Sequence, residues 1–247
     1  MEEKIGVFDS GIGGVSILKE LIFNIPNACY FYLSDSINNP YGDKTEKEIK
    51  KIVFQNVEFL LSKNCKIIVI ACNTATAVAI DDLRKKYPTV TFIGSSPAIK
   101  MAHDEKSHGK TLLLATKLTL ECERVKNLMK KYPIEDLKIH PCTGLADLIE
   151  NKKIDEAREY INKKLVNYKD VDTVILGCTH YPLIKKEFEK FFSKAKIIDG
   201  SKEIAKQTKM KVEELNLIFE NSKIYFLDTS KNLEKQNIFA FYMTNFL

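Results

Sequence analysis

Residues 68–74 read Ile-Val-Ile-Ala-Cys-Asn-Thr, and residues 174–180 read Val-Ile-Leu-Gly-Cys-Thr-His. In both stretches an apolar strand pattern runs into a cysteine, a polar residue and the expected start of a helix. A parallel strand carries its last residue to the carboxyl edge of its sheet, where open α/β folds bind ligands. The two stretches therefore predict two lobes that each hold one thiol, Cys72 or Cys178, against one shared substrate. Such a pair suits proton removal from one face of a carbon and proton return to the other.

The composition is that of an ordinary globular protein, with 45% hydrophobic and 29% charged residues among 247. The formal charge is +5, but the lysines are interleaved with acidic residues, and basic runs with stacking aromatics are absent. We therefore expect no nucleic-acid partner. No apolar run approaches the ~20 residues that span a bilayer, and the first strand starts at once after residue 3 without a secretory leader. We expect a cytoplasmic protein with reduced thiols and no membrane partner.

Short apolar runs that resemble buried strands alternate with helical patterns along the whole chain. This alternation predicts an α/β fold of two similar lobes, each a mainly parallel sheet flanked by helices. The expected strands are 4–8, 29–33, 66–71, 90–94, 111–115, 137–140, 172–177, 196–198 and 223–227. The expected helices are 15–23, 46–61, 75–86, 118–131, 155–165, 183–192, 201–212 and one after Thr229.

The best boundaries between the lobes are Gly94-Ser95-Ser96-Pro97 and Asp199-Gly200-Ser201. They predict a first lobe of residues 1–96 plus 201–247 and a second lobe of residues 97–200. The cleft between the lobes is the expected active site.

The segment Asp9-Ser10-Gly11-Ile12-Gly13-Gly14 follows the first expected strand. Its glycines permit a tight turn and let an anion approach backbone N–H groups, although a plain strand-to-helix turn is equally consistent. Ser16 replaces the third glycine of a dinucleotide fingerprint, and the segment is not a Walker loop, which weakens nucleotide hypotheses. In Asn39-Pro40-Tyr41-Gly42, the Tyr hydroxyl and free amides are candidates to hold a carboxylate, with a plain loop as the alternative.

A thiol between a strand end and a helix start faces the positive end of the helix, so we expect a lowered pKa for Cys72 and Cys178. Asn73, Thr74 and Thr179 supply donors for an anionic substrate. His180 is placed to tune or reprotonate Cys178, or else to cap a helix. The partner spacings of a zinc site are missing, so no metal is expected. The other cysteines are interpreted as packing residues: Cys29, Cys65, Cys122 and Cys142.

Four segments together resemble the glutamate racemases, which are cofactor-independent enzymes of the aspartate/glutamate racemase superfamily. They are Gly6-Val7-Phe8-Asp9-Ser10-Gly11-Ile12-Gly13-Gly14, Asn39-Pro40-Tyr41-Gly42, Ala71-Cys72-Asn73-Thr74-Ala75 and Leu176-Gly177-Cys178-Thr179-His180-Tyr181-Pro182. Three segments depart from the family pattern: 35–39, 94–97 and 142–144.

The resemblance implies racemisation of L-glutamate to D-glutamate, without a cofactor, for peptidoglycan synthesis in the bacterial cytoplasm, and a homodimer. It implies that Cys72 acts on D-glutamate and Cys178 on L-glutamate, with Asp9 and His180 as assisting groups and Glu150 as a matching carboxylate. The residues that match substrate-binding positions are Ser10, Tyr41, Gly42, Asn73, Thr74, Thr116, Thr119 and Thr179.

Three alternatives stay open at this point. The first is a racemase for aspartate or another acidic amino acid, which shares the use of two thiols. A decarboxylase-like relative that works with one thiol is disfavoured because the chain has both Cys72 and Cys178. A non-catalytic binding or regulatory protein that keeps the fold is the third.

Overall fold

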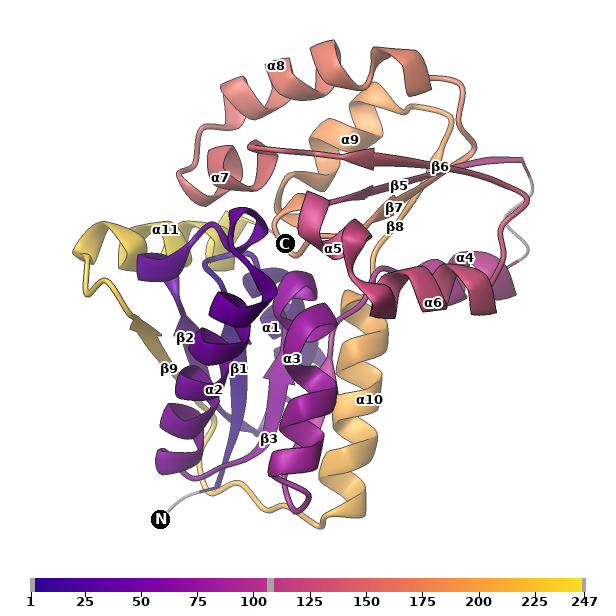
Figure 1. The fold of residues 1–247 in the computed structure, drawn as a ribbon. Coiled ribbons are helices and arrows are strands. Elements are labelled where there is room, and N and C mark those ends of the chain that lie inside the picture. The colour runs from indigo at the N-terminus through magenta and orange to yellow at the C-terminus, as the bar shows by residue number, and fades with distance from the viewer. Residues whose placement is uncertain (1–2, 106–108, 246–247) are drawn as a thin grey trace.

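The computed structural model describes residues 3–105 and 109–245, which form two lobes, each built on one sheet (Figure 1). The sheets have strand orders β4-β3-β1-β2-β9 and β6-β5-β7-β8, and the pairings are parallel. This confirms the predicted fold class. The strands are β1 (Lys4–Asp9), β2 (Cys29–Ser34), β3 (Cys65–Ile70), β4 (Thr91–Gly94), β5 (Lys110–Ala115), β6 (Asp136–Pro141), β7 (Thr173–Leu176), β8 (Lys196–Ile198) and β9 (Lys223–Asp228).

The two sheets share one winding order. In each, the first strand lies between the second and the third, and the fourth lies beyond the third. The chain thus reverses direction across the sheet between β1 and β3, and again between β5 and β7, which are the positions where open α/β folds place their ligands. Since β3 and β7 are each the third strand of their sheet, the residues that follow them occupy equivalent places.

Helices cover both faces of the first sheet (Figure 1). On β3, Ile67 and Val69 face the core shared with α1 and α10, whereas Ile68 and Ile70 face the core shared with α2 and α3. Apolar residues on both faces are typical of a buried parallel strand. The α-helices are α1 (Val15–Asn24), α2 (Glu46–Ser62), α3 (Asn73–Lys86), α4 (Ile99–Asp104), α5 (Lys117–Glu121), α6 (Glu123–Lys131), α7 (Leu145–Glu150), α8 (Ile154–Lys164), α9 (Lys185–Phe191), α10 (Ser201–Glu214) and α11 (Leu233–Asn245).

Two expected helices differ from the structure. The helix expected over 118–131 is broken at Cys122, whose extended backbone ends α5 and begins α6. The helix expected from residue 183 is preceded by the 3₁₀-helix η4 (Tyr181–Ile184) and begins at Lys185. The other 3₁₀-helices are η1 (Ser36–Asn38), η2 (Tyr41–Asp43) and η3 (Val166–Tyr168).

The C-terminal helix α11 reaches both lobes (Figure 1). Its Phe239 ring stacks on Phe226 of β9, with 4.1 Å between ring centroids, which fixes the helix to the first sheet. Its Tyr242 hydroxyl donates to the backbone oxygen of Ile149 in α7 at 2.8 Å.

Among the helices within 3–105 and 109–245, none combines the length and apolarity that crossing a bilayer requires.

Candidate active site

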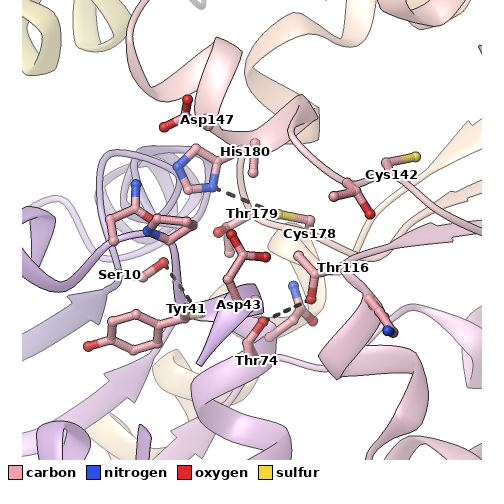
Figure 2. Close-up of a pocket in the computed structure, with 18 of the residues that line it drawn as sticks. Ser10, Tyr41, Asp43, Thr74, Thr116, Cys142, Asp147, Cys178, Thr179 and His180 are labelled. Carbon is pink, nitrogen blue, oxygen red and sulfur yellow. Dashed lines mark hydrogen bonds between the residues drawn. The ribbon is translucent and has the colours of Figure 1, made fainter. Parts of the chain in front are cut away.

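One cavity of about 300 Å³ lies where the carboxyl ends of the two sheets meet (Figure 2). Cys72 follows β3 and Cys178 follows β7, and both line this cavity. The side chains are almost fully buried, with 5% and 7% of their surface exposed. The structure therefore brings together two thiols from equivalent positions in the two lobes, as the paired stretches predict.

Cys72 is the N-cap residue of α3, and its Sγ accepts a hydrogen bond from the Ala75 N–H at 3.5 Å. The thiol in turn donates to the Ser10 hydroxyl at 3.5 Å. The expected lowering of its pKa is nevertheless wrong. Burial, followed by the negative charge of Asp9, raises the pKa of Cys72 to about 12, which outweighs these hydrogen bonds.

Cys178 has a different setting, because the four-residue helix η4 follows it instead of an α-helix. The expected α-helix dipole is therefore absent at this thiol. Its Sγ instead lies 3.8 Å from His180 Nδ1 (Figure 2). The other ring nitrogen, Nε2, lies 2.8 Å from Glu150 Oε2. A thiol, an imidazole and a carboxylate thus form a continuous chain.

The His180–Glu150 pair is buried, yet its charges are stabilised. Burial opposes a charged imidazole, but the hydrogen bonds with Cys178 and Glu150 raise the pKa of His180 well above its usual value. For Glu150, burial acts to raise the pKa, but the hydrogen bond and charge of His180 and the charge of Lys235 lower it overall. The pair is therefore held as imidazolium and carboxylate.

Asp9 ends β1 and lies behind the cavity lining, fully buried. Its Oδ2 accepts a hydrogen bond from the Thr179 hydroxyl at 3.0 Å, and its Oδ1 accepts one from the Gly11 N–H at 3.1 Å. Burial raises the pKa of Asp9 to about 6, although the charge of His180 lowers it. Asp9 is thus an acid whose proton exchanges close to neutral pH.

The glycines of the segment after β1 let the second lobe approach closely. A Cβ on Gly11 would overlap the Glu150 carboxylate, and one on Gly13 would lie 2.5 Å from Thr179 Oγ1. The Ile12 N–H donates to Glu150 Oε2 at 2.8 Å. The sequence predicts that an anion can approach the backbone N–H groups of this segment. At Ile12 that anion is the Glu150 carboxylate of the protein itself.

Three hydroxyls connect the lobes on another side of the cavity. Thr74 Oγ1 lies 3.1 Å from Thr116 Oγ1 and 3.0 Å from Thr119 Oγ1, and the Thr116 hydroxyl donates to Thr119 at 2.8 Å. Thr74 and Thr116 line the cavity (Figure 2), whereas Thr119 is fully buried behind them. Thr119 is placed to orient the other two hydroxyls.

The Tyr41 hydroxyl is turned to a protein partner. It donates to Asp35 Oδ2, which also accepts from the Asn56 side-chain amide at 3.0 Å. Tyr41 lines the cavity, but its hydroxyl is engaged by this carboxylate. The expectation that this group holds a substrate carboxylate therefore finds no support in its geometry.

The remaining expected site residues have definite places. Ser10, Gly42, Asn73, Thr179 and His180 line the cavity, whereas Glu150, like Asp9, lies behind it. Cys142 is buried as predicted, but it also lines the cavity, which packing alone did not predict. The lining residues that the sequence interpretation missed include Asp43, Lys117, Thr143 and Asp147.

Lys235 was also missed, and it lies behind the site, with its Nζ 2.8 Å from Glu150 Oε1. No local pattern marks it, because 85 positions separate it from its partner.

Among the described residues, no cluster of three His, Cys, Asp or Glu side chains is arranged to hold a metal ion.

Residues 26–208 match the model of the Asp/Glu/Hydantoin racemase family. The chain is 42% identical over 237 residues to the glutamate racemase of Clostridium acetobutylicum, covering 92% of each chain. It superposes with a TM-score of 0.84 on Escherichia coli glutamate racemase in complex with L-glutamate and the activator UDP-MurNAc-Ala, at 26% identity, covering 98% of this chain and 96% of that one. For Francisella tularensis glutamate racemase in complex with D-glutamate, the TM-score is 0.80 at 28% identity, with 98% and 94% covered. The chain therefore belongs to the Asp/Glu/Hydantoin racemase family, among the glutamate racemases.

Proposed function

We propose that this protein interconverts L- and D-glutamate, with Cys72 and Cys178 as the two bases. One observation carries the proposal: two buried thiols from equivalent strand ends line a single cavity between the lobes. The relatives described above, which are named glutamate racemases, support glutamate as the substrate. A cavity of about 300 Å³ suits a small amino acid.

In the proposed reaction, the Cys178 thiolate takes the α-proton of L-glutamate. The Cα–H bond breaks, an S–H bond forms, and the electron pair delocalises into the α-carboxylate. The Cys72 thiol then gives its proton to the opposite face, and its S–H electron pair remains on sulfur as a thiolate. The reverse reaction begins with Cys72 on D-glutamate. After each turnover the two sulfurs have exchanged protonation states.

Stabilisation of the carbanion-like transition state is the main demand, because an amino-acid α-proton is weakly acidic. We infer that donors from both lobes surround the substrate carboxylates, namely Asn73, Thr74, Thr116 and Thr179, with Ser10 and the backbone at Gly42 beside them. Fixed donors in a site that excludes water are more effective than water itself. The two-thiol mechanism does not call for a pyridoxal group, because the protein's own dipoles hold the developing charge.

The high pKa of Cys72 has a chemical use in this scheme. A base of high pKa matches a weakly acidic Cα–H bond better, although less of it is ionised. We infer that the ammonium group of the incoming amino acid supplies the positive charge that stabilises the thiolate. His180 supports Cys178 in the same way from within the protein.

Optical rotation tests the substrate. Purified protein should bring solutions of L- and D-glutamate to zero rotation, with aspartate far slower. A higher kcat/KM for aspartate would assign the enzyme to that acid instead. Binding of glutamate without loss of rotation would favour a non-catalytic protein.

D-Glutamate is a constituent of peptidoglycan, so we infer that the reaction supplies cell-wall precursors in the bacterial cytoplasm. We also propose a homodimer, which rests on the family resemblance alone. Sedimentation of the purified chain at micromolar concentration tests it, and a monomer throughout would contradict it.

A further inference from the structure

Glu150 divides its two carboxylate oxygens between two partners. Oε2 faces His180 Nε2 at 2.8 Å and also accepts the Ile12 N–H at 2.8 Å. Oε1 accepts a hydrogen bond from Lys235 Nζ at 2.8 Å. The carboxylate side chain is 2% exposed and that of Lys235 is 17% exposed, so solvent screens this contact little.

Lys235 belongs to α11, and the packing of that helix holds the lysine in place. Phe239 is stacked on Phe226 of the first sheet, and the Tyr242 hydroxyl is bonded to Ile149, the residue before Glu150. The helix therefore presents Lys235 to Glu150 from a position fixed at both lobes. A side chain of this kind orients the carboxylate that in turn orients the imidazole.

We propose that Lys235 is a positioning residue for racemisation, which holds Glu150 and through it sets the orientation and protonation of the His180 ring beside Cys178. The proposal rests on the function proposed above and deepens it. It gives the C-terminal helix a place in the chemistry of the Cys178 half-reaction.

The charges that face the His180–Glu150 pair come from several elements. Asp9 on β1 and Cys178 after β7 add negative charge when they ionise, and the Tyr32 and Tyr242 hydroxyls lie near enough to interact electrostatically with Glu150. Lys235 adds positive charge on the opposite side of the carboxylate from the imidazole. The Lys235 charge therefore offsets part of this negative charge, and so it lowers the affinity of the His180–Glu150 pair for its proton.

The direction of the effect does not depend on where the pair keeps its proton. Removing a nearby positive charge disfavours every deprotonated state of His180 and Glu150 relative to the protonated one. Both macroscopic pKa values of the pair must therefore rise. Loosening of α11 by itself would lower stability without this shift.

The test uses the full chain with isotope-labelled histidine, and follows the His180 ring by NMR across a pH series. The His180→Asn variant assigns the resonance. In Lys235→Met we expect the titration midpoint to move up by roughly one pH unit, because an opposite charge at close range has been removed. The limb of the kcat/KM profile on which activity falls as the imidazolium loses its proton should move up with it, so at a pH between the two midpoints the variant should keep up to about tenfold more of its maximal kcat/KM than wild type keeps. Lys235→Arg should restore both.

Lys152→Met is the matched control. Lys152 Nζ lies 3.8 Å from the centroid of the Phe241 ring of α11, so this variant loosens the same helix while leaving the Glu150 carboxylate untouched. We expect it to leave the His180 titration at its wild-type position. An equal shift in Lys152→Met, or none in Lys235→Met, would overturn the proposal.

Two further outcomes are distinguishable. If Lys235→Met is not recovered folded, Lys235→Gln carries the same prediction with a polar side chain. If wild-type protein fails to racemise glutamate, the proposed function fails, while the NMR midpoints still decide whether Lys235 controls the imidazole.

Discussion

The Thr179 hydroxyl donates to Asp9 Oδ2 at 3.0 Å, although 170 positions separate the two residues in the chain. Asp9 ends β1, the central strand of the first sheet, and Thr179 follows β7 of the second. The Gly11 N–H holds the other oxygen of the same carboxylate at 3.1 Å. A fully buried acid is thus fixed in orientation by both lobes.

The first prediction concerns pH and stability. Burial raises the pKa of Asp9 from 3.8 to about 6, so the folded state binds this proton more tightly than the unfolded chain. Its contribution is fully present below pH 3.8 and is lost as pH rises through about 6, by ~3 kcal/mol. The Asn side chain of Asp9→Asn does not titrate, so this variant does not lose stability in this way. Its free energy of unfolding, relative to that of wild type, should therefore rise as the pH increases from 3.8 through about 6.

Urea denaturation at several pH values measures this difference. Asp155→Asn is the control, because the Asp155 side chain is 92% exposed. Parallel stability curves for wild type and Asp9→Asn would contradict the prediction.

The second prediction separates the two thiols. Enantiomers have equal free energy, so kcat/KM must fall equally in both directions in Cys72→Ser and in Cys178→Ser, by at least ~100-fold for loss of a positioned base. The asymmetry appears instead in solvent exchange. In D₂O, Cys72→Ser should exchange the α-proton of L-glutamate slowly, and Cys178→Ser that of D-glutamate.

Proton NMR of the α-position follows this exchange. Cys65→Ser changes a buried thiol outside the cavity and should keep both activities. Wild-type racemisation by either active-site variant would defeat the two-base assignment.

The third prediction tests the close approach at Gly11. In Gly11→Ala the new methyl group would overlap Glu150, so the carboxylate must move away from His180 and Ile12. We expect a stability loss of ~1–3 kcal/mol from overpacking, together with lower kcat/KM. At Gly200 an added Cβ meets its nearest atom at 3.4 Å, so Gly200→Ala should differ little from wild type in melting temperature. Equal melting temperatures and equal kcat/KM in Gly11→Ala and Gly200→Ala would contradict the prediction that Glu150 leaves no room for a side chain at residue 11.

The fourth prediction concerns Tyr41. Its hydroxyl donates to buried Asp35, so Tyr41→Phe should lower the free energy of unfolding by ~1 kcal/mol. Denaturation and glutamate kinetics, measured side by side, distinguish this from substrate binding. A raised KM for glutamate with unchanged stability would indicate that the Tyr41 hydroxyl binds the substrate.

The alternation of strands and helices was predictable from sequence because it depends on local patterns. The strand over residues 66–71 and the helix starting at Glu46 are expected nearly as observed, since apolar runs and a capping box are local signals. The short helix α7 was missed, because its six residues are too few to establish a helical period. The break at Cys122 was missed because propensity alone continues the helix.

The site was predictable to the extent that its residues lie in strand-end motifs. Cys72 and Cys178 do, and the cavity brings them together. Lys235 could not be found in this way, because only the packing of α11 brings it to Glu150. The pKa of Cys72 was predicted in the wrong direction, because the cost of desolvation depends on how the lobes close around the thiol.

The position of β9 bears on how the chain is synthesised. This strand pairs with β2, yet residues 29–34 leave the ribosome nearly 200 residues before residues 223–228. All four strands of the other sheet emerge in between. One edge of β2 must therefore stay unpaired during translation, exposed to wrong partners, until the last part of the nascent chain arrives.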